Sequence, residues 1–163
     1  MYSSHYDEQF LEADKLISDG LIKEALEILS QIINEQPDFG RAHNHLGWIY
    51  EQRLKYYDKA EQHYKASIQF SPEYPAGWLN YIYLLTNQRR FDELVKYLEK
   101  AMKVRGIYKP YLWNEYASMH ELSQNFDSAI HYYNKAIMDT LNKNEIEGYE
   151  ESIARCEKKR PIL

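Results

Sequence analysis

Apolar side chains recur along most of the chain at spacings of three and four residues, the period of one face of an α-helix. Leu46, Ile49 and Tyr50 show this period, and Tyr64 and Ile68 resume it beyond the segment "LKYY". The breaks between such stretches are short. The pattern predicts nine amphipathic helices, at residues 6–18, 22–35, 40–53, 57–70, 75–88, 91–104, 110–123, 126–140 and 144–159.

Two positions within these apolar faces recur at steps of 34 or 35 residues and are small except at Ile82 and Leu94. The first series consists of Ala13, Gly47 and Ala117, and the second consists of Ala25, Ala60 and Ala129. A large side chain follows the second series four residues later, at Leu29, Tyr64, Leu98 and Tyr133. Such a period indicates a repeat architecture. It predicts four repeats of two helices each, at residues 6–39, 40–74, 75–109 and 110–143.

Gly47 lies in the middle of a predicted helix, where glycine costs about 1 kcal/mol relative to alanine. Two antiparallel helices approach closely only where their facing side chains are small. We therefore expect Gly47 to face Ala60, so that the packing gained there offsets the cost. The third repeat has the bulky Ile82 and Leu94 at these two positions, which predicts a wider helix spacing in that repeat.

The residues Leu46-Gly47-x-x-Tyr50, then Ala60-x-x-x-Tyr64, then Pro72, resemble the tetratricopeptide repeat. Trp78 and Trp113 also stand where that repeat has its tryptophan. The resemblance covers residues 6–143. It implies an all-α fold in which residues 1–163 form a single domain, a right-handed superhelical solenoid of antiparallel helix pairs with about nine helices.

The two ends of the chain carry features expected of the ends of such a solenoid. Residues 144–159 place Ile146, Tyr149, Ile153 and Cys156 on one helical face and charged side chains on the other. Stacked repeats need a terminal element of this kind to close the open core, so we expect a capping helix. At the other end, Ser4-x-x-Asp7 is typical of a capping box that opens the first helix.

The sequence offers no constellation typical of catalysis, of a cofactor site or of a metal site. All the glycines are isolated, and neither Gly-x-Ser-x-Gly nor His-Glu-x-x-His occurs. His43 and His45 point about 200° apart on a helix, so they do not share a metal unaided. We expect His43 to pack in the interior and His45 to face a groove. Cys156, the single cysteine, is expected to act as a small apolar side chain.

Composition and charge narrow the range of partners. The net charge of −5 gives no support to nucleic-acid binding, and no apolar run approaches the ~20 residues of a membrane span. The first residues, "MYSSHYDEQF", show no secretory signal. We expect a cytoplasmic protein, either a monomer or a weak homo-oligomer, that binds another protein and neither nucleic acid nor a membrane.

The family resemblance implies a concave groove, lined by the first helix of each repeat, that holds an extended peptide or a helix of the partner. Trp48 and Tyr83 would be its aromatic anchors, because helix packing does not require them. The implied groove residues are Phe10, Asp14, Arg41, Asn44, His45, Trp48, Glu51, Asn80, Tyr83, Asn87, Tyr111, Asn114 and Ser118. The same helices also present Asp7, Ile17, Gln52, Leu79 and Glu121. The alternative is that these are ordinary solvent-facing positions.

Chaperone-binding members of the family hold a C-terminal carboxylate with lysine, arginine and asparagine side chains from three successive first helices. A clamp that starts at the first repeat would here consist of Phe10, Asp14, His45, Ala76 and Asn80. One that starts at the second would consist of Asn44, Trp48, Asn80, Tyr111 and Glu115. Neither set contains the required cations, which argues against a co-chaperone of that kind.

Three functional hypotheses follow. The leading one is a non-enzymatic adaptor or scaffold that binds another protein. The alternative is a small acidic chaperone for a secreted or assembly-prone client, because the pI of about 5.7 and the small size are similar to those of tetratricopeptide secretion chaperones. The third is an RNA-binding helical repeat, which would need basic, base-reading residues at regular repeat positions.

Overall fold

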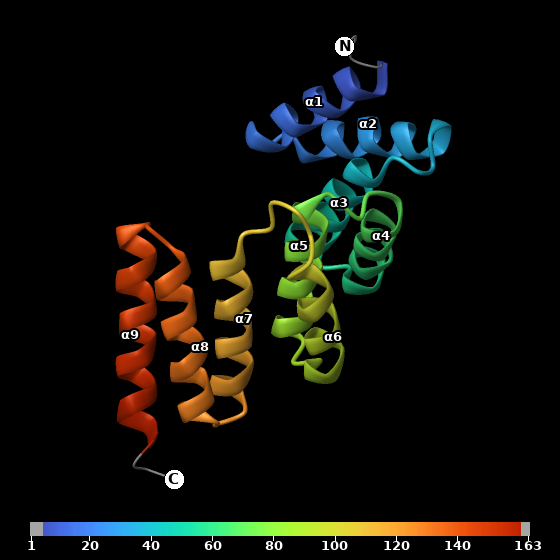
Figure 1. Cartoon of the computed structure of the whole chain (residues 1–163). Helices are drawn as coiled ribbons and strands as arrows, with labels where there is room; N and C mark the ends of the chain where they lie inside the picture. The colour runs from blue at the N-terminus through green and yellow to red at the C-terminus, as the bar shows by residue number, and fades with distance from the viewer. Residues whose placement is uncertain (1–4, 161–163) are drawn as a thin grey trace. The chain divides into compact units, whose positions relative to one another are not determined.

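The computed structural model describes residues 5–160, which form nine α-helices and one π-helical turn and contain no strand (Figure 1). The elements are α1 (His5–Ser18), α2 (Ile22–Glu35), α3 (Gly40–Trp48), η1 (Ile49–Arg53), α4 (Tyr57–Phe70), α5 (Pro75–Asn87), α6 (Phe91–Ala101), α7 (Lys109–Leu122), α8 (Phe126–Asp139) and α9 (Lys143–Lys159). All nine predicted helices are confirmed. Ser4, which begins the predicted capping box, lies outside the described residues.

The predicted bounds hold to within one residue, with two exceptions. The helix predicted at 40–53 is α3 followed by the π-helical turn η1, and the helix predicted at 91–104 ends at Ala101. We call α1, α3, α5 and α7 the first helices of the four repeats, and α2, α4, α6 and α8 the second helices.

The turns that join the two helices of each repeat have a common feature. A residue with a left-handed φ stands in each turn, at Gly20, Lys55, Arg89 and Gln124. In three of the four turns the next N–H donates to the carbonyl oxygen five residues back, for example Asn125 N–H to His120 O at 2.8 Å. This bond satisfies a carbonyl at the helix end. Glycine occupies the left-handed position only once, so composition alone did not reveal the turn.

The π-helical turn η1 accommodates one additional residue in the second repeat. Thirteen positions separate Gly47 from Ala60, whereas twelve separate Ala117 from Ala129. In η1 the Leu54 N–H donates to Ile49 O, and the turn closes with a bond that spans six residues, from Tyr56 N–H to Tyr50 O at 2.8 Å. An α-helix absorbs a single inserted residue as a π-bulge. The second helix of this repeat therefore keeps its register.

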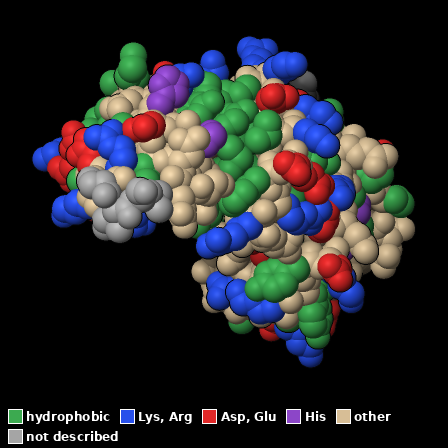
Figure 2. All heavy atoms as spheres, turned by 90° about the horizontal axis from the view of Figure 1, so that it is seen from below, with side chains coloured by type: hydrophobic (Ala, Val, Ile, Leu, Met, Phe, Trp, Pro, Cys, Tyr) green, Lys and Arg blue, Asp and Glu red, His purple; other side chains and the backbone are tan. Residues whose placement is uncertain are grey.

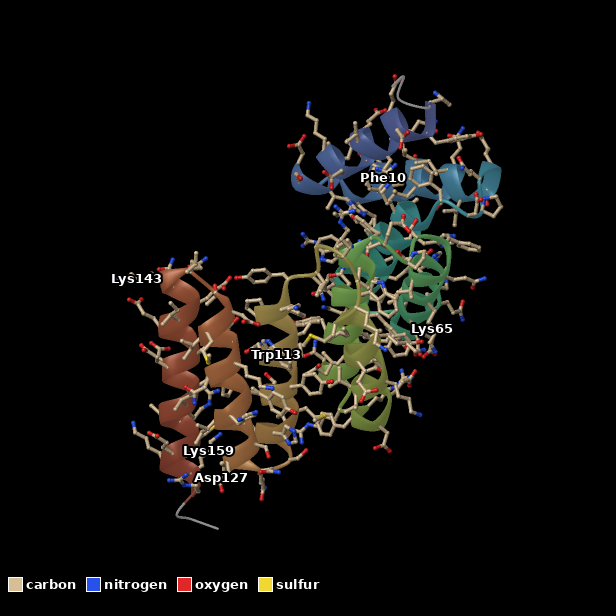
Figure 3. The ribbon with its side chains drawn as sticks, viewed as in Figure 1. Phe10, Lys65, Trp113, Asp127, Lys143 and Lys159 are labelled. Atoms are coloured by element: carbon tan, nitrogen blue, oxygen red, sulfur yellow. The ribbon has the colours of Figure 1, made fainter. Side chains whose placement is uncertain are left out.

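The chain divides into two compact units, Met1–Tyr81 and Ile82–Leu163, which we call the N-terminal and C-terminal units. In the N-terminal unit, buried residues of α1, α2, α3 and η1 form one apolar cluster. Phe10, a residue of α1, belongs to this cluster (Figure 3). The single-domain organisation and the handedness of the solenoid remain predictions.

In the C-terminal unit, α7, α8 and α9 lie side by side (Figure 1). Tyr149 and Ile153 of α9 pack against a buried cluster that contains Ala117, Ala129 and Tyr133. Cys156 is itself part of this cluster and is fully buried. The predicted apolar face of residues 144–159 therefore covers α8, and Cys156 acts as a small apolar side chain. Ion pairs also tie the end of α9 to the same unit, including that of the next residue, Arg160, whose Nη1 lies 2.9 Å from Asp127 Oδ1.

His43 has the packing role that its position predicted. Its Nε2 lies 2.9 Å from the carbonyl oxygen of Pro37, so that nitrogen donates a proton. Its Nδ1 lies 3.0 Å from Nδ1 of His63. Burial, followed by the neighbouring His43 and Lys59, lowers the pKa of His63 to about 4. His63 is therefore an uncharged part of the α3–α4 packing at neutral pH.

Gly47 lies against the buried ring of Tyr64. A Cβ atom at Gly47 would stand 2.6 Å from Cδ1 and from Cε1 of that ring. The close neighbour is thus Tyr64, one turn beyond the Ala60 that the sequence suggested, because the ring extends over the glycine. Ile82 and Leu94 are both fully buried, and the wider spacing of the third helix pair remains a prediction.

We expect Gly47→Ala to destabilise the protein although alanine favours a helix. Overpacking against the Tyr64 ring costs about 1–3 kcal/mol, which exceeds the ~1 kcal/mol gained from helix propensity. Gly148→Ala is the matched control, because Gly148 is also inside a helix and nothing lies within 4 Å of a Cβ there. Urea unfolding should show Gly47→Ala less stable than wild type by about 1 kcal/mol and Gly148→Ala more stable. Stabilisation by both variants would contradict the close contact.

Candidate functional site

Most of the predicted groove residues line two hollows, one in each unit. The N-terminal hollow has a volume of about 320 Å³ and is lined by Asp14, Ile17, Asn44, His45, Trp48, Tyr74, Ala76 and Asn80. The C-terminal hollow has a volume of about 460 Å³ and is lined by Tyr83, Thr86, Asn87, Asn114, Glu115, Ser118, Glu121, Leu122, Tyr133, Arg155 and Lys159.

The two hollows use the same positions of the repeat. His45 and Glu115 each stand two residues before the small residue of their helix, Gly47 or Ala117. The other shared positions pair Asp14 with Tyr83, Ile17 with Thr86, Asn44 with Asn114, and Trp48 with Ser118. The repeat thus provides a common backbone plan, while the side chains give each hollow its own chemistry.

Polar side chains in the N-terminal hollow are largely paired with one another. Nδ2 of Asn80 donates to Oδ1 of Asn44 at 2.9 Å, and Nε2 of His45 lies 2.9 Å from Oδ1 of Asp14. Asn44 is only 3% exposed, so its amide supports Asn80 and has little access to a peptide. The side chain of His45 is likewise mostly covered, with its ring edge-on to Phe10.

Trp48 is both a wall of the N-terminal hollow and a packing residue. It is partly buried and packs against the apolar cluster of that unit. The guanidinium of Arg53 lies 5.1 Å from its ring centroid. The sequence suggested an aromatic residue that packing does not require, but the structure shows that part of this ring supports the core.

Glu115 is the most deeply buried charged residue of the C-terminal hollow, with 5% of its surface exposed. The Nδ2 of Asn114 donates to its Oε1 at 3.3 Å. Burial raises the pKa of Glu115, and hydrogen bonds with Thr86, Asn114 and Tyr111 oppose that rise. Within residues 5–160, Glu115 has no ion-pair partner.

Glu121, one helical turn and a half beyond Glu115, has the opposite environment. Nε and Nη2 of Arg155 donate to its two carboxylate oxygens at 2.7 and 2.8 Å, and Nζ of Lys159 lies 3.0 Å from Oε1. The hydroxyl of Tyr133 also donates to it. Chiefly because of the Arg155 hydrogen bonds, the pKa of Glu121 falls to about 2. The two carboxylates of this hollow therefore differ in whether a cation neutralises them.

Glu51 occupies the position in the second repeat that Glu121 occupies in the fourth. The Tyr64 hydroxyl donates to Oε2 of Glu51 at 2.7 Å, as Tyr133 does to Glu121. Glu51 is buried, and burial raises its pKa. It was predicted as a groove residue, but the structure places it in the interior, where it lines neither hollow.

Three other predicted groove residues also lie outside the hollows. Phe10 is buried in the apolar cluster. The guanidinium of Arg41 lies 4.9 Å from the ring centroids of Phe10 and Phe39 and pairs with Asp7. Tyr111 is half-buried and hydrogen-bonds with Glu115. These three side chains contact other residues of the protein and do not line a hollow. Burial of their apolar atoms favours this arrangement.

Sequence reasoning did not select several residues that line the hollows. They are Tyr74 and Ala76 in the N-terminal hollow, and Thr86, Glu115, Leu122, Tyr133, Arg155 and Lys159 in the C-terminal one. Glu115 could have been found, because it occupies the repeat position of His45. Arg155 and Lys159 lie four residues apart on one side of α9, which is the spacing expected for two cations that meet one carboxylate.

No metal site is apparent in the described part of the chain: residues 5–160 contain no group of three or more His, Cys, Asp or Glu side chains that could hold a metal ion. None of the described helices is long and apolar enough to cross a membrane.

Figure 2 shows basic and acidic side chains interspersed on the face that it presents. That face therefore has no large area of a single charge.

The family model of the tetratricopeptide repeat matches residues 40–74 and 110–138, which fall in the second and fourth predicted repeats. A comparison with curated proteins gives no match.

Three solved structures are similar over most of this chain. TTC0263, a thermophilic TPR protein in Thermus thermophilus, has a TM-score of 0.73 and 18% identity, and the match covers 93% of this chain and 82% of that one. PilW, a widely conserved type IV pilus biogenesis factor, has a TM-score of 0.72 and 18% identity, with 95% and 76% covered. MamA AMB-1 has a TM-score of 0.65 and 21% identity, with 80% and 70% covered. At identities near 20%, this likeness shows a shared fold.

We expect the Arg155–Glu121 pair to stabilise the C-terminal unit in a pH-dependent way. The pKa of Glu121 is about 2 in the folded protein and ordinarily near 4.5, so this stabilisation is present above pH 4.5 and is lost as the pH falls towards 2. Arg155→Met should lower the free energy of unfolding at pH 7 by about 1 kcal/mol, and the difference from wild type should shrink below pH 4.5.

Lys143→Met is the control for this prediction, because Lys143 and Glu147 form an exposed pair at 3.6 Å on the same helix. Exposed pairs of this kind contribute little, so its unfolding free energy should match that of wild type. Urea titrations at pH 7, 5 and 3.5 would measure all three proteins. A loss in Arg155→Met that is constant across these pH values would show that packing, and not the ion pair, is responsible.

Proposed function

Because this chain belongs to the tetratricopeptide-repeat proteins, we propose that it is a non-enzymatic adaptor or scaffold that binds a peptide or helix of another protein. The observation that carries the proposal is the pair of hollows on its first helices. They occupy the same repeat positions yet differ in chemistry, so each would select a different side chain of the partner.

Tyr83 is the best candidate for an anchor of the partner. Its side chain lines the C-terminal hollow and remains 43% exposed. Tyrosine provides a large contact area at little conformational cost, which is why aromatic residues dominate many protein interfaces. The amides of Asn87 and Asn114 lie in the same hollow, and each can both donate to and accept from a peptide backbone. An aromatic anchor beside such amides favours binding in one register.

The polar side chains of the N-terminal hollow are paired with one another, so this hollow would offer the partner a preorganised surface. The Asn44–Asn80 and His45–Asp14 contacts fix the side chains of three helices relative to one another within that unit. A preorganised surface loses less side-chain entropy when a partner binds. Asp14 is the part of this network that remains well exposed, and it is therefore where a partner would make polar contact.

We expect Tyr83→Ala to remove most binding of the principal partner without unfolding the protein. Tyr57→Ala is the matched control, because Tyr57 is 45% exposed in the same chain but lines neither hollow. The tagged proteins would be isolated from cells of the native source, and the bound proteins would be quantified by mass spectrometry. Tyr83→Ala should reduce the principal partner at least tenfold, which corresponds to about 1.4 kcal/mol.

Thermal unfolding of both variants completes this test. The melting temperature of each should remain within about 3 °C of wild type, a shift of roughly 1 kcal/mol for a chain of this length. Trp48→Ala is less informative, because Trp48 also packs against the core and its loss should lower stability. Equal loss of the partner in Tyr57→Ala, or full retention in Tyr83→Ala, would argue against binding at the hollows.

The isolated partners also distinguish an adaptor from the chaperone alternative. An adaptor recovers partners that stay soluble after separation. A dedicated chaperone recovers one client in equal amount, and that client precipitates once it is released.

A further inference from the structure

The C-terminal hollow contains a carboxylate that no cation neutralises within the described residues. Glu115 lines the hollow but is almost fully buried, and its hydrogen-bond partners Thr86, Asn114 and Tyr111 are all uncharged. A buried charge without a counterion costs free energy that neutral donors offset only in part. The raised pKa of Glu115 reflects this cost. A cation that entered the hollow would therefore gain a strong interaction there.

The basic residues of the hollow are already engaged elsewhere. Arg155 donates two hydrogen bonds to Glu121, and Lys159 donates a third to the same carboxylate. Together these bonds hold both cations at Glu121 and leave Glu115 without one. A cation that paired with Glu115 would therefore come from outside the described part of the chain.

The other lining groups also suit a cation. The amide oxygens of Asn87 and Asn114 and the hydroxyl oxygen of Ser118 can accept hydrogen bonds from an ammonium or guanidinium group. The exposed ring of Tyr83 offers an aromatic face, which attracts cations. The equivalent position of the N-terminal hollow has His45, already paired with Asp14. The two hollows therefore do not select the same side chain.

We propose that the C-terminal hollow receives a basic side chain, lysine or arginine, of the partner peptide, whose charged group pairs with Glu115. The alkyl part of that side chain passes Tyr83, and the amides of Asn87 and Asn114 fix its direction. This inference rests on the proposed function, because the partner supplies the cation. It goes further by naming the side chain that determines specificity.

A library of random dodecapeptides displayed on phage provides the probe. Selection on the full-length protein should enrich peptides with lysine or arginine at one fixed position. The best peptide would then be synthesised with that residue and with norleucine (or, for arginine, citrulline) in its place. The two peptides would be titrated into wild type and into Glu115→Gln, which keeps the shape of the side chain and its hydrogen-bonding oxygen.

On wild type, the neutral peptide should bind at least tenfold more weakly than the basic one. On Glu115→Gln, the basic peptide should lose a similar factor, and the neutral peptide should bind no more weakly than the basic one. This coupling is what a direct contact predicts. Glu99→Gln, the same change of charge at an exposed position of α6 that lines neither hollow, should leave the ratio between the two peptides as in wild type.

The remaining outcomes overturn the inference in distinguishable ways. If the selected peptides bind and Tyr83→Ala weakens them, but they show no preferred basic residue, the inference fails while the proposed function holds. The inference would also be overturned if replacing the basic residue by the neutral one weakened binding to wild type and to Glu115→Gln by the same factor. If no peptide binds and Tyr83→Ala retains the native partner, the proposed function fails together with the inference. Should Glu115→Gln not fold, the ratio between the affinities of the two peptides is measured on Glu115→Asp, whose carboxylate stands farther back. A ratio smaller than on wild type supports the inference, and an unchanged ratio overturns it.

Discussion

The structure depends on the contact between a small residue on three of the four first helices, Ala13, Gly47 and Ala117, and the second helix that faces each of them. Gly47 shows how close that contact is, because even one methyl group there would overlap the Tyr64 ring. Ala117 and Tyr133 occupy the same positions in the fourth repeat and share one buried cluster. Packing at this seam fixes the rotation of each first helix. It thereby determines which side chains point into the core and which line a hollow.

That rotation explains why residues at equal repeat positions meet such different environments. In the second and the fourth repeat, a glutamate accepts a hydrogen bond from the buried tyrosine of the second helix. Burial is the main influence on the pKa of Glu51, whereas hydrogen bonds from Arg155 of α9 are the main influence on that of Glu121. Likewise, one position provides His45 in one hollow and Glu115 in the other. The backbone therefore repeats while the chemistry varies, which is how one architecture can present several different contacts.

The helices could be predicted from the sequence because each has a clear apolar period and the repeat confirms it four times. The π-helical turn was not predicted, although the additional residue between Gly47 and Ala60 signals it. Exposure was harder to predict than helix position. Asn44 lies on α3 and Glu51 in the π-helical turn that follows it, but hydrogen bonds from Asn80 and Tyr64 allow these polar groups to be buried. Such pairings join residues distant in sequence, and periodicity does not reveal them.

The central claim is that the hollows on the first helices bind the partner. Nuclear magnetic resonance on the isotopically labelled full chain, titrated with its co-purified partner, tests it most directly. The side-chain amide signals of Asn80, Asn87 and Asn114 and the backbone signals around Tyr83 should shift most. Signals from Tyr56 and Tyr57 at the start of α4, and from the exposed sides of α4 and α8, should stay in place. Larger shifts at those second-helix positions than in the hollows would contradict the account.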